Sequence, residues 1–235
     1  ENSSESVFEI ANKVYDKNIA TGTNVPHFFT SRRISGYQGY GFHVPTQDLY
    51  DAFDADDPRI TYVFTQTGDR YKGDTEAQDN AESPSGYHDY KMTVPAVEKT
   101  GFDVWMISYN IRLIRYSDVL LMYAEALNEI SYSNSQTSDA MVALNAVHTR
   151  AGLSPVQITE LADQDSFRKA IMLERQQEFP YEGHRWFDLV RMGGAKEAMK
   201  AEGHTIQDFQ FLYPIPKTEL ERINNTELLW QNPGY

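Results

Sequence analysis

The chain has 235 residues, no cysteine and a formal net charge of −13 at pH 7. This charge argues against nucleic acids and anionic membrane surfaces as partners, because both are bound through clustered lysine and arginine. The absence of cysteine excludes disulfide bonds, thiolate metal sites and a cysteine nucleophile. The length allows one domain with a sizeable core or two small domains.

Residues 1–108 are predicted to contain little regular structure. Residues 7–10 and 60–64 have the pattern of short strands, with side chains on alternating faces. A short helix is predicted at residues 45–53, because Thr46 is a suitable N-cap and the pattern stops at an Asp-Pro pair. The elements of this part are therefore few and short.

Two segments of this first part are predicted to be exposed loops. Residues 35–42 alternate glycine with aromatic side chains and have no helical period. Residues 65–85 are rich in Gly, Asp, Thr, Asn, Glu and Ser, which is typical of a long solvated excursion. Long loops on a rigid scaffold commonly carry binding residues, so residues 1–108 are expected to face the ligand.

Helices are predicted from residue 109 onwards. Apolar side chains recur at three- and four-residue steps in residues 109–127 and again in residues 140–151, where Gly152 ends the pattern. These two helices are expected to form an antiparallel hairpin, and residues 167–179 with residues 185–192 a second one. Consecutive hairpins resemble tetratricopeptide repeats, although the full repeat consensus is absent.

The tail is predicted to be mostly extended. Thr218 and Glu221 have the spacing of a capping box for one short helix, and Trp230 and Tyr235 are expected to anchor the tail on the helices. The whole chain is thus predicted to be mainly α, with helical hairpins, a loop-rich irregular region and few short strands. It is expected to form a single region in three parts: the ligand-facing residues 1–108, the hairpins at 109–203 and the tail at 204–235.

Residues 174–194 form a charged, aromatic-rich elbow between two helical pieces that break at Pro180. Glu174 and Glu178 fall on the apolar stripe of the first piece, so their carboxylates need partners if they are buried. The second piece offers cations three residues from carboxylates, as in Glu182 with Arg185 and in Asp188 with Arg185 and Arg191.

Two interpretations of this elbow compete. A glycosidase requires a pair of carboxylates about 5–10 Å apart around the sugar, and Glu174, Glu178, Glu182 and Asp188 are candidates. The alternative is a structural network, in which interleaved arginines lower the carboxylate pKa values and hold these groups as ion pairs. The nearly equal number of arginines favours the structural network.

Five blocks of sequence resemble the SusD/RagB family of surface nutrient-binding lipoproteins. They are ERQQEFPYEGHRWFDLVR (174–191), IRYSDVLLMYAEA (114–126), TRAGL (149–153), YPIP (213–216) and QNPGY (231–235). Their order and spacing make the match specific. It covers most of this chain but about the C-terminal half of a typical member. Pro180 departs from the pattern, since a small helix former is expected there, and it predicts a sharper break.

The resemblance implies a non-catalytic protein without a cofactor that binds oligosaccharides at the outer surface of the outer membrane. It also implies a TonB-dependent, SusC-like transporter as partner, into which captured glycans pass. The family's signal peptide and lipid-anchored cysteine lie at the extreme N-terminus, outside this chain. Which glycan is bound, and whether peptides replace glycans, stay open.

Candidate ligand contacts follow from residue chemistry, because the family's contacting aromatics lie in variable loops. Sugars place their apolar faces on aromatic rings while polar groups bind the hydroxyls. The candidates are aromatic residues in the irregular part, for each of which core packing is the competing role: Phe28, Tyr37, Tyr40, Phe42, Tyr87 and Trp105.

No metal site is predicted. The six histidines lack metal-ligand spacing, and Asp54, Asp56 and Asp57 fit a solvated helix end better than a calcium site. Two other function classes remain as alternatives to glycan binding. One is a glycoside hydrolase that uses carboxylates between Glu174 and Asp188, and the other is a helical-repeat adaptor that binds a protein partner.

Overall fold

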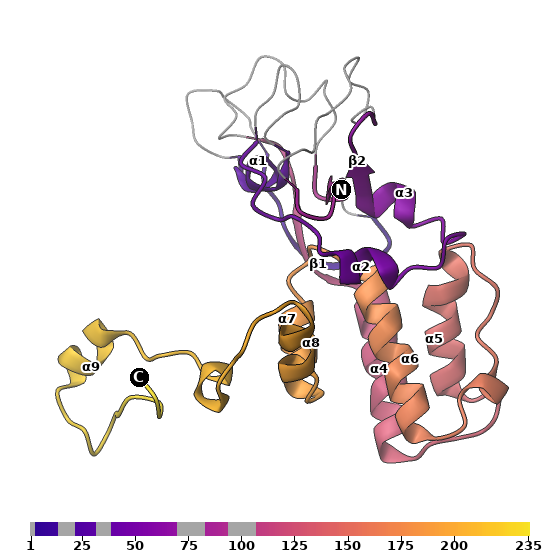
Figure 1. The fold of residues 1–235 in the computed structure, drawn as a ribbon. Helices are drawn as coiled ribbons and strands as arrows, with labels where there is room; N and C mark the ends of the chain where they lie inside the picture. Colours follow the sequence, from indigo (N-terminus) through magenta and orange to yellow (C-terminus); the bar gives the residue numbers. More distant parts are fainter. Residues whose placement is uncertain (1–2, 14–21, 32–38, 70–82, 94–106) are drawn as a thin grey trace. The chain divides into compact units, whose positions relative to one another are not determined.

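The computed structural model describes residues 3–13, 22–31, 39–69, 83–93 and 107–235 (Figure 1). The chain divides into two compact units, Glu1–His184 and Arg185–Tyr235. The described part of the chain is mainly helical with two two-stranded sheets, which confirms the predicted class. None of its helices is both long and apolar enough to cross a membrane.

Three long helices form the main core of the first unit. They are α4 (Tyr116–Ile130), α5 (Asp139–Arg150) and α6 (Gln164–Glu178), which lie side by side in Figure 1. Their apolar stripes meet in a cluster of fully buried side chains, among them Leu121, Met141, Leu144, Phe167 and Ile171. The predicted hairpin of α4 and α5 is confirmed. The stripe of α6 packs into the same core, so the three helices share one apolar centre.

Local capping fixes where these helices begin and end. Ser138 accepts a hydrogen bond from the Met141 amide at the start of α5. Asp163 and Ser166 form a capping box at the start of α6. The helix ends at Glu178, as Pro180 predicted. A short 3-10 helix, Ile158–Glu160, lies in the connection between α5 and α6.

The prediction that a helix begins near residue 109 was wrong. Ile111–Arg115 forms strand β4, which pairs antiparallel with β1 (Ser6–Ile10), and α4 starts only at Tyr116. β-Branched residues favour the extended chain, and the register places Glu9 opposite Arg112, a favourable cross-strand charge pair. The strand predicted at residues 7–10 is confirmed as β1, and it supplies the partner that makes residues 111–115 extended.

Besides β1, the described residues of the irregular part contain five short elements. They are α1 (Val25–Phe29), α2 (Gln47–Asp51), α3 (Ile60–Val63), β2 (Phe64–Gln66) and β3 (Tyr87–Asp89). The Thr46 hydroxyl caps α2 by accepting from the Leu49 amide at 3.2 Å, as predicted. Phe53, Val63 and Phe64 form a small second core beneath these elements.

The strand predicted at residues 60–64 is also corrected. Residues 60–63 are the helix α3, and extended structure begins at Phe64, where β3 lies opposite. The register pairs Phe64 with Asp89 and Gln66 with Tyr87. A strand needs such a partner for its backbone groups, and none of the paired positions in this ladder precedes Phe64.

The second unit contains α7 (Arg185–Arg191), α8 (Ala195–Ala201), a 3-10 helix (Asp208–Phe211) and α9 (Lys217–Ile223). The predicted helix at residues 185–192 is confirmed as α7. The short helix of the tail exists, but Pro216 occupies its N-cap without a side-chain hydrogen bond. The capping box predicted from Thr218 and Glu221 was therefore wrong, because Thr218 already lies inside the helix.

The aromatic residues of the tail pack locally. Trp186 stacks on Phe211 with centroids 6.4 Å apart. Tyr235 meets Phe209 edge-on at 5.1 Å, and its hydroxyl donates to a carbonyl of the tail itself. Trp230 is 64% exposed. Within the second unit, Tyr235 therefore packs on the tail itself. The expectation that Trp230 and Tyr235 anchor the tail on the helices stays a prediction.

Candidate functional site

A buried arginine joins the irregular part of the first unit to its helices. The Arg59 guanidinium lies 2.7 Å from Glu174 Oε1 and 2.8 Å from Asp57 Oδ2, and it donates to Gln177 Oε1 at 2.9 Å. Gln177 in turn donates to the Ala52 carbonyl at 2.6 Å. Because Glu174 and Gln177 belong to α6, these bonds fix α3, and the strand that follows it, against the helical core.

A second buried cluster surrounds Arg115 at the end of β4. Its guanidinium lies 2.8 Å from Glu178 Oε1 and 2.8 and 2.9 Å from the two Glu182 oxygens. Lys91 lies 2.5 Å from Glu182 Oε1, and Glu5 Oε1 lies 2.5 Å from Arg115 Nη1. Burial opposes ionisation of Glu182, but the Lys91 and Arg115 charges outweigh it and hold the pKa of that carboxyl below its ordinary value.

The carboxylates of the charged elbow are therefore held by cations. Glu174 is 3% exposed, its Oε1 accepts from Arg59, and its Oε2 lies 2.7 Å from His148 Nδ1. A glycosidase requires a protonated acid and a second carboxylate that both face the sugar. Buried carboxylates bound on both oxygens do not supply this arrangement. The structural ion-pair network is confirmed, and the hydrolase interpretation of these residues loses its support.

The network draws its cations both from neighbouring positions and from distant parts of the chain. Asp188 pairs with Arg191 at 2.8 Å, as their spacing predicted. Glu182, by contrast, is bound by Arg115 and Lys91, which the sequence separates from it by 67 and 91 positions. The predicted pairs of Arg185 stay predictions. Helical spacing predicted that these carboxylates form ion pairs. It could not predict partners that are distant in the sequence, such as Arg115 and Lys91.

Phe28, Tyr40 and Phe42 form a group of nearly parallel rings, which we name the three-ring cluster. Ring centroids are 5.6 Å apart for Phe28 and Tyr40, 5.7 Å for Phe28 and Phe42, and 5.1 Å for Tyr40 and Phe42. The interplanar angles are 22°, 13° and 18°. Phe42 is 58% exposed, whereas the other two rings are half-buried. The cluster thus presents an aromatic surface to solvent.

Backbone hydrogen bonds hold the three rings together. The Tyr40 amide donates to the His27 carbonyl at 2.9 Å, and the Phe42 amide donates to the Phe28 carbonyl at 2.9 Å. The buried His27 ring also meets Tyr40 edge-on at 4.8 Å. Residues 39–42 therefore run along α1, which places rings from two sequence segments on one surface.

This close approach requires glycine. A Cβ built on Gly39 would lie 2.0 Å from the Thr30 carbonyl oxygen, far inside any real contact. Gly41 adopts φ 59°, in the left-handed region that side-chain-bearing residues rarely occupy. The glycine-aromatic alternation seen in the sequence thus serves two purposes, since the glycines allow the chain to approach α1 and the rings between them become the surface.

Four of the six predicted contact residues lie in the described ranges. Phe28, Tyr40 and Phe42 come together in the three-ring cluster. Tyr87 lies elsewhere, in a pocket described below. Tyr37 and Trp105 lie outside the described residues. The assignment of these residues to ligand binding stays a prediction, whereas their grouping is a property of the fold.

The first unit also contains an open pocket of about 340 Å³. The rings of Tyr50 and Tyr87 form a parallel stack in its wall, with centroids 4.2 Å apart and planes inclined by 11°. A hydrogen bond with the Tyr50 hydroxyl raises the pKa of Tyr87 to about 12. The pocket, which we name the Tyr87 pocket, is lined by Tyr50, Ile60, Thr61, Phe64, Thr65, Gln66, Asp69, Tyr87 and Tyr90.

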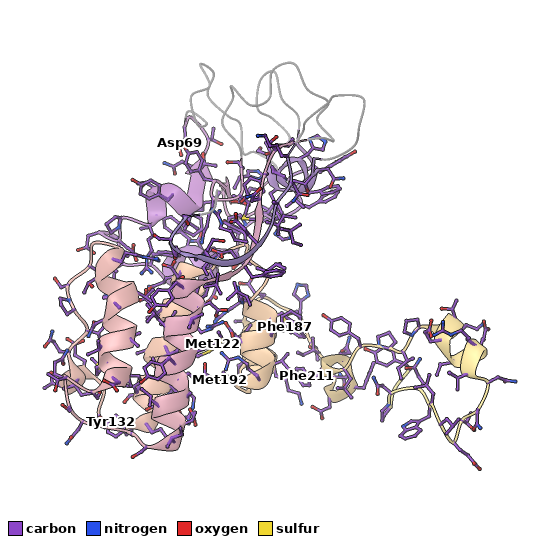
Figure 2. The ribbon with its side chains drawn as sticks, turned by 180° about the vertical axis from the view of Figure 1, so that it is seen from behind. Asp69, Met122, Tyr132, Phe187, Met192 and Phe211 are labelled. Atoms are coloured by element: carbon purple, nitrogen blue, oxygen red, sulfur yellow. The ribbon has the colours of Figure 1, made fainter. Side chains whose placement is uncertain are left out.

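The polar side of the Tyr87 pocket is built around Asp69. The Gln66 amide donates to Asp69 Oδ2 at 2.7 Å, and the Thr65 hydroxyl donates to the same oxygen at 3.5 Å. Figure 2 shows Asp69 just beyond β2. Sequence reasoning missed Asp69, because only the pairing of β2 with β3 brings residues 64–69 beside Tyr87.

Aromatic rings beside a carboxylate, an amide and hydroxyls are the chemistry of sugar recognition. Rings cover the apolar C–H faces, and the polar groups exchange hydrogen bonds with hydroxyls. Among the residues that the structure describes, no three His, Asp or Glu side chains are arranged to hold a metal ion. The described surfaces thus combine apolar rings with hydrogen-bonding groups.

Comparison with known proteins identifies relatives along nearly the whole chain. A family model described as the SusD family matches residues 4–235. Among curated proteins, the SusD-like protein P2 of Formosa agariphila is 31% identical over 215 residues. That alignment covers 84% of this chain and 41% of the relative.

Solved structures show the same fold. Surface glycan-binding protein A from Bacteroides thetaiotaomicron superposes with a TM-score of 0.77 at 25% identity, covering 99% of this chain and 52% of that one. A protein of that name from the same organism, in complex with laminarihexaose, superposes with a TM-score of 0.74 at 25% identity. That superposition covers 97% of this chain and 52% of the other. A laminarin-binding SusD-like protein superposes with a TM-score of 0.74 at 27% identity, covering 100% of this chain and 51% of the other. The chain thus spans about half the length of these relatives.

Proposed function

This chain belongs to the SusD family, and from that premise we propose that the protein captures oligosaccharides without cleaving them. The observation that carries the proposal is the three-ring cluster, where Phe42 exposes 58% of its surface beside two nearly parallel rings. Flat aromatic surfaces bind the apolar faces of sugar rings.

The negative net charge of the chain favours an uncharged ligand over an anionic one. The chain carries a formal net charge of −13, which repels polyanions and leaves neutral sugars unaffected. A neutral oligosaccharide gains from ring contacts and hydrogen bonds and does not need a cationic patch. We therefore propose neutral glycans as the ligand class.

Glucan oligosaccharides of the laminarin type are the first ligands to test. Two of the structures similar to this chain are named for laminarihexaose or laminarin. Those names describe the relatives, whose sequences are 25% and 27% identical to this chain and about twice its length. For this protein the laminarin class is part of the proposal.

Binding without hydrolysis is supported by the state of the acidic residues. Glu174, Glu178 and Glu182 are held in buried ion pairs with arginine, lysine or histidine side chains. The family resemblance further suggests a position at the cell surface, a lipid anchor outside this chain and delivery of the glycan to a SusC-like, TonB-dependent transporter. These cellular features belong to the proposal.

A ligand panel tests the proposal. The purified protein is titrated calorimetrically with neutral oligosaccharides of the laminarin, cellulose and starch classes, and with peptides of similar size. The expected result is saturable binding to at least one neutral glycan and no binding to peptides. Saturable binding to peptides alone would reject glycan capture.

Co-purification of a tagged, membrane-anchored form with an outer-membrane barrel protein tests the transporter partner separately.

A further inference from the structure

We propose that the Tyr87 pocket is a second sugar subsite, which accepts a neutral sugar unit and rejects acidic ones through Asp69. This inference rests on the proposed function, since it assumes that the ligand is a glycan. It adds a site and a selectivity that the three-ring cluster does not provide. No residue of the three-ring cluster lines the pocket.

The dimensions of the pocket suit one sugar unit. Its volume of about 340 Å³ is near the lower end of the range of about 300–1,000 Å³ that is typical of small-molecule sites. A long stretch of glycan fits an open aromatic surface better than a pocket of this size. The three-ring cluster is therefore suited to the glycan backbone, and the Tyr87 pocket to a chain end or branch.

The pocket supplies rings on one side and hydrogen-bonding groups on the other. The parallel Tyr50 and Tyr87 rings, 4.2 Å apart, form an apolar wall. Thr61, Thr65 and Asp69 add hydroxyls and a carboxylate to the lining. This combination gives a sugar ring an apolar contact for its C–H bonds and polar partners for its hydroxyls.

Among the described residues that line the pocket, Asp69 is the single charged one. Its Oδ2 accepts from the Gln66 amide and the Thr65 hydroxyl, which fixes the orientation of the carboxylate. Within the described ranges, no lysine or arginine forms an ion pair with it, and no group donates to Oδ1. One oxygen of an oriented carboxylate is thus available to a ligand.

This charge pattern determines which sugars enter. A neutral sugar donates a hydroxyl proton to Asp69 Oδ1 in a charge-assisted hydrogen bond, which is stronger than a neutral one. A uronate or sulfate group would face the carboxylate, and the described lining offers no lysine or arginine to balance it. The pocket therefore selects against acidic sugars directly, in addition to the general repulsion from the chain's net charge.

The test compares Asp69→Asn with Asp56→Asn. Asparagine at position 69 keeps an oxygen for the Gln66 amide and removes the charge. Asp56 is exposed and does not line the pocket, so its substitution removes the same charge elsewhere. Laminarihexaose is the neutral probe and an oligogalacturonate of equal length is the acidic probe. Both are titrated into the full chain, and thermal unfolding confirms that each variant is folded.

We expect Asp69→Asn to weaken laminarihexaose binding about tenfold and to raise the ratio of acidic to neutral affinity, while Asp56→Asn leaves both unchanged. Equal effects of the two substitutions, or none, would overturn the inference. Tyr87→Ala gives a second check, because it removes part of the aromatic wall and should weaken the binding of laminarihexaose. If Phe42→Ala removes binding while the Asp69 and Tyr87 variants bind normally, the subsite is rejected and glycan capture stands. If neither probe binds the unaltered protein and the ligand panel also fails, the proposed function itself is rejected.

Discussion

Arg59 Nη1 lies 2.7 Å from Glu174 Oε1, although 115 positions separate the two residues in the sequence. This bond connects the segment that leads into the Tyr87 pocket with α6, one of the three core helices of the first unit. Buried charges are costly unless they are paired, so the arginine and the glutamate each depend on the other. The ion-paired elbow thus acts as a framework for the segment that carries the Tyr87 pocket.

Replacing Arg59 tests this framework role. Arg59→Met removes the buried cation that Glu174 shares with Asp57, so we expect a loss of about 3–5 kcal/mol in the free energy of unfolding. Denaturant titration measures it. Arg168→Met is the control, because Arg168 pairs with Glu129 at the surface and should matter little. Equal losses from both substitutions would show that the buried network has no special role.

Replacing Phe42 tests the three-ring cluster. Phe42→Ala removes the most exposed ring of the cluster, and we expect glycan affinity to fall about tenfold, or about 1.4 kcal/mol, with little change in stability. Phe187→Ala is the matched control, because Phe187 is an exposed phenylalanine of the second unit. Calorimetric titration of both variants gives the answer. Unchanged affinity in Phe42→Ala would remove this ring from the binding surface.

Replacing Gly39 tests how the cluster is built. Alanine at this position would place a Cβ 2.0 Å from the Thr30 carbonyl, so residues 39–42 could no longer run along α1. We expect Gly39→Ala to lose glycan affinity at least as strongly as Phe42→Ala. Gly194→Ala serves as control, since its Cβ would meet only a Leu189 methyl at an ordinary 3.7 Å. Normal binding by Gly39→Ala would mean that this packing is not required.

The paired carboxylates predict a specific pH dependence of stability. For Glu5 and Glu182 burial opposes ionisation, but neighbouring cations outweigh it and lower both pKa values below the ordinary 4.5. Their contribution is thus fully present above about pH 4.5 and is lost as the pH falls through the lowered values of the folded state. Unfolding free energies measured across this range should decrease towards acid. Glu182→Gln should flatten the decrease, and an unchanged slope would contradict the assignment.

Much of the helical core could be predicted from the sequence. Apolar periodicity identified α5, α6 and α7, because each helix buries one face and its spacing is visible within the segment. The start of α4 was misplaced, since residues 111–115 become a strand only in the presence of β1. The helix α3 was mistaken for a strand for a related reason, because pairing with β3 begins at Phe64.

The candidate site was predictable only in part. Phe28, Tyr40 and Phe42 were each predicted as candidate contacts, and the structure brings their rings together, whereas their role in binding stays a prediction. Asp69 was missed because its relation to Tyr87 depends on a sheet register between two separated segments. The cations that hold Glu182 were missed for the same reason, since Arg115 and Lys91 reach it across the fold.

The most direct test of the central claim measures binding and cleavage in the same samples. The purified protein is titrated with laminari-oligosaccharides, and the reducing ends are counted before and after incubation. Capture without hydrolysis predicts saturable binding with no increase in reducing ends, in the unaltered protein and in Glu174→Gln alike. A steady release of reducing ends that Glu174→Gln abolishes would contradict this account and would make the elbow carboxylates an active site.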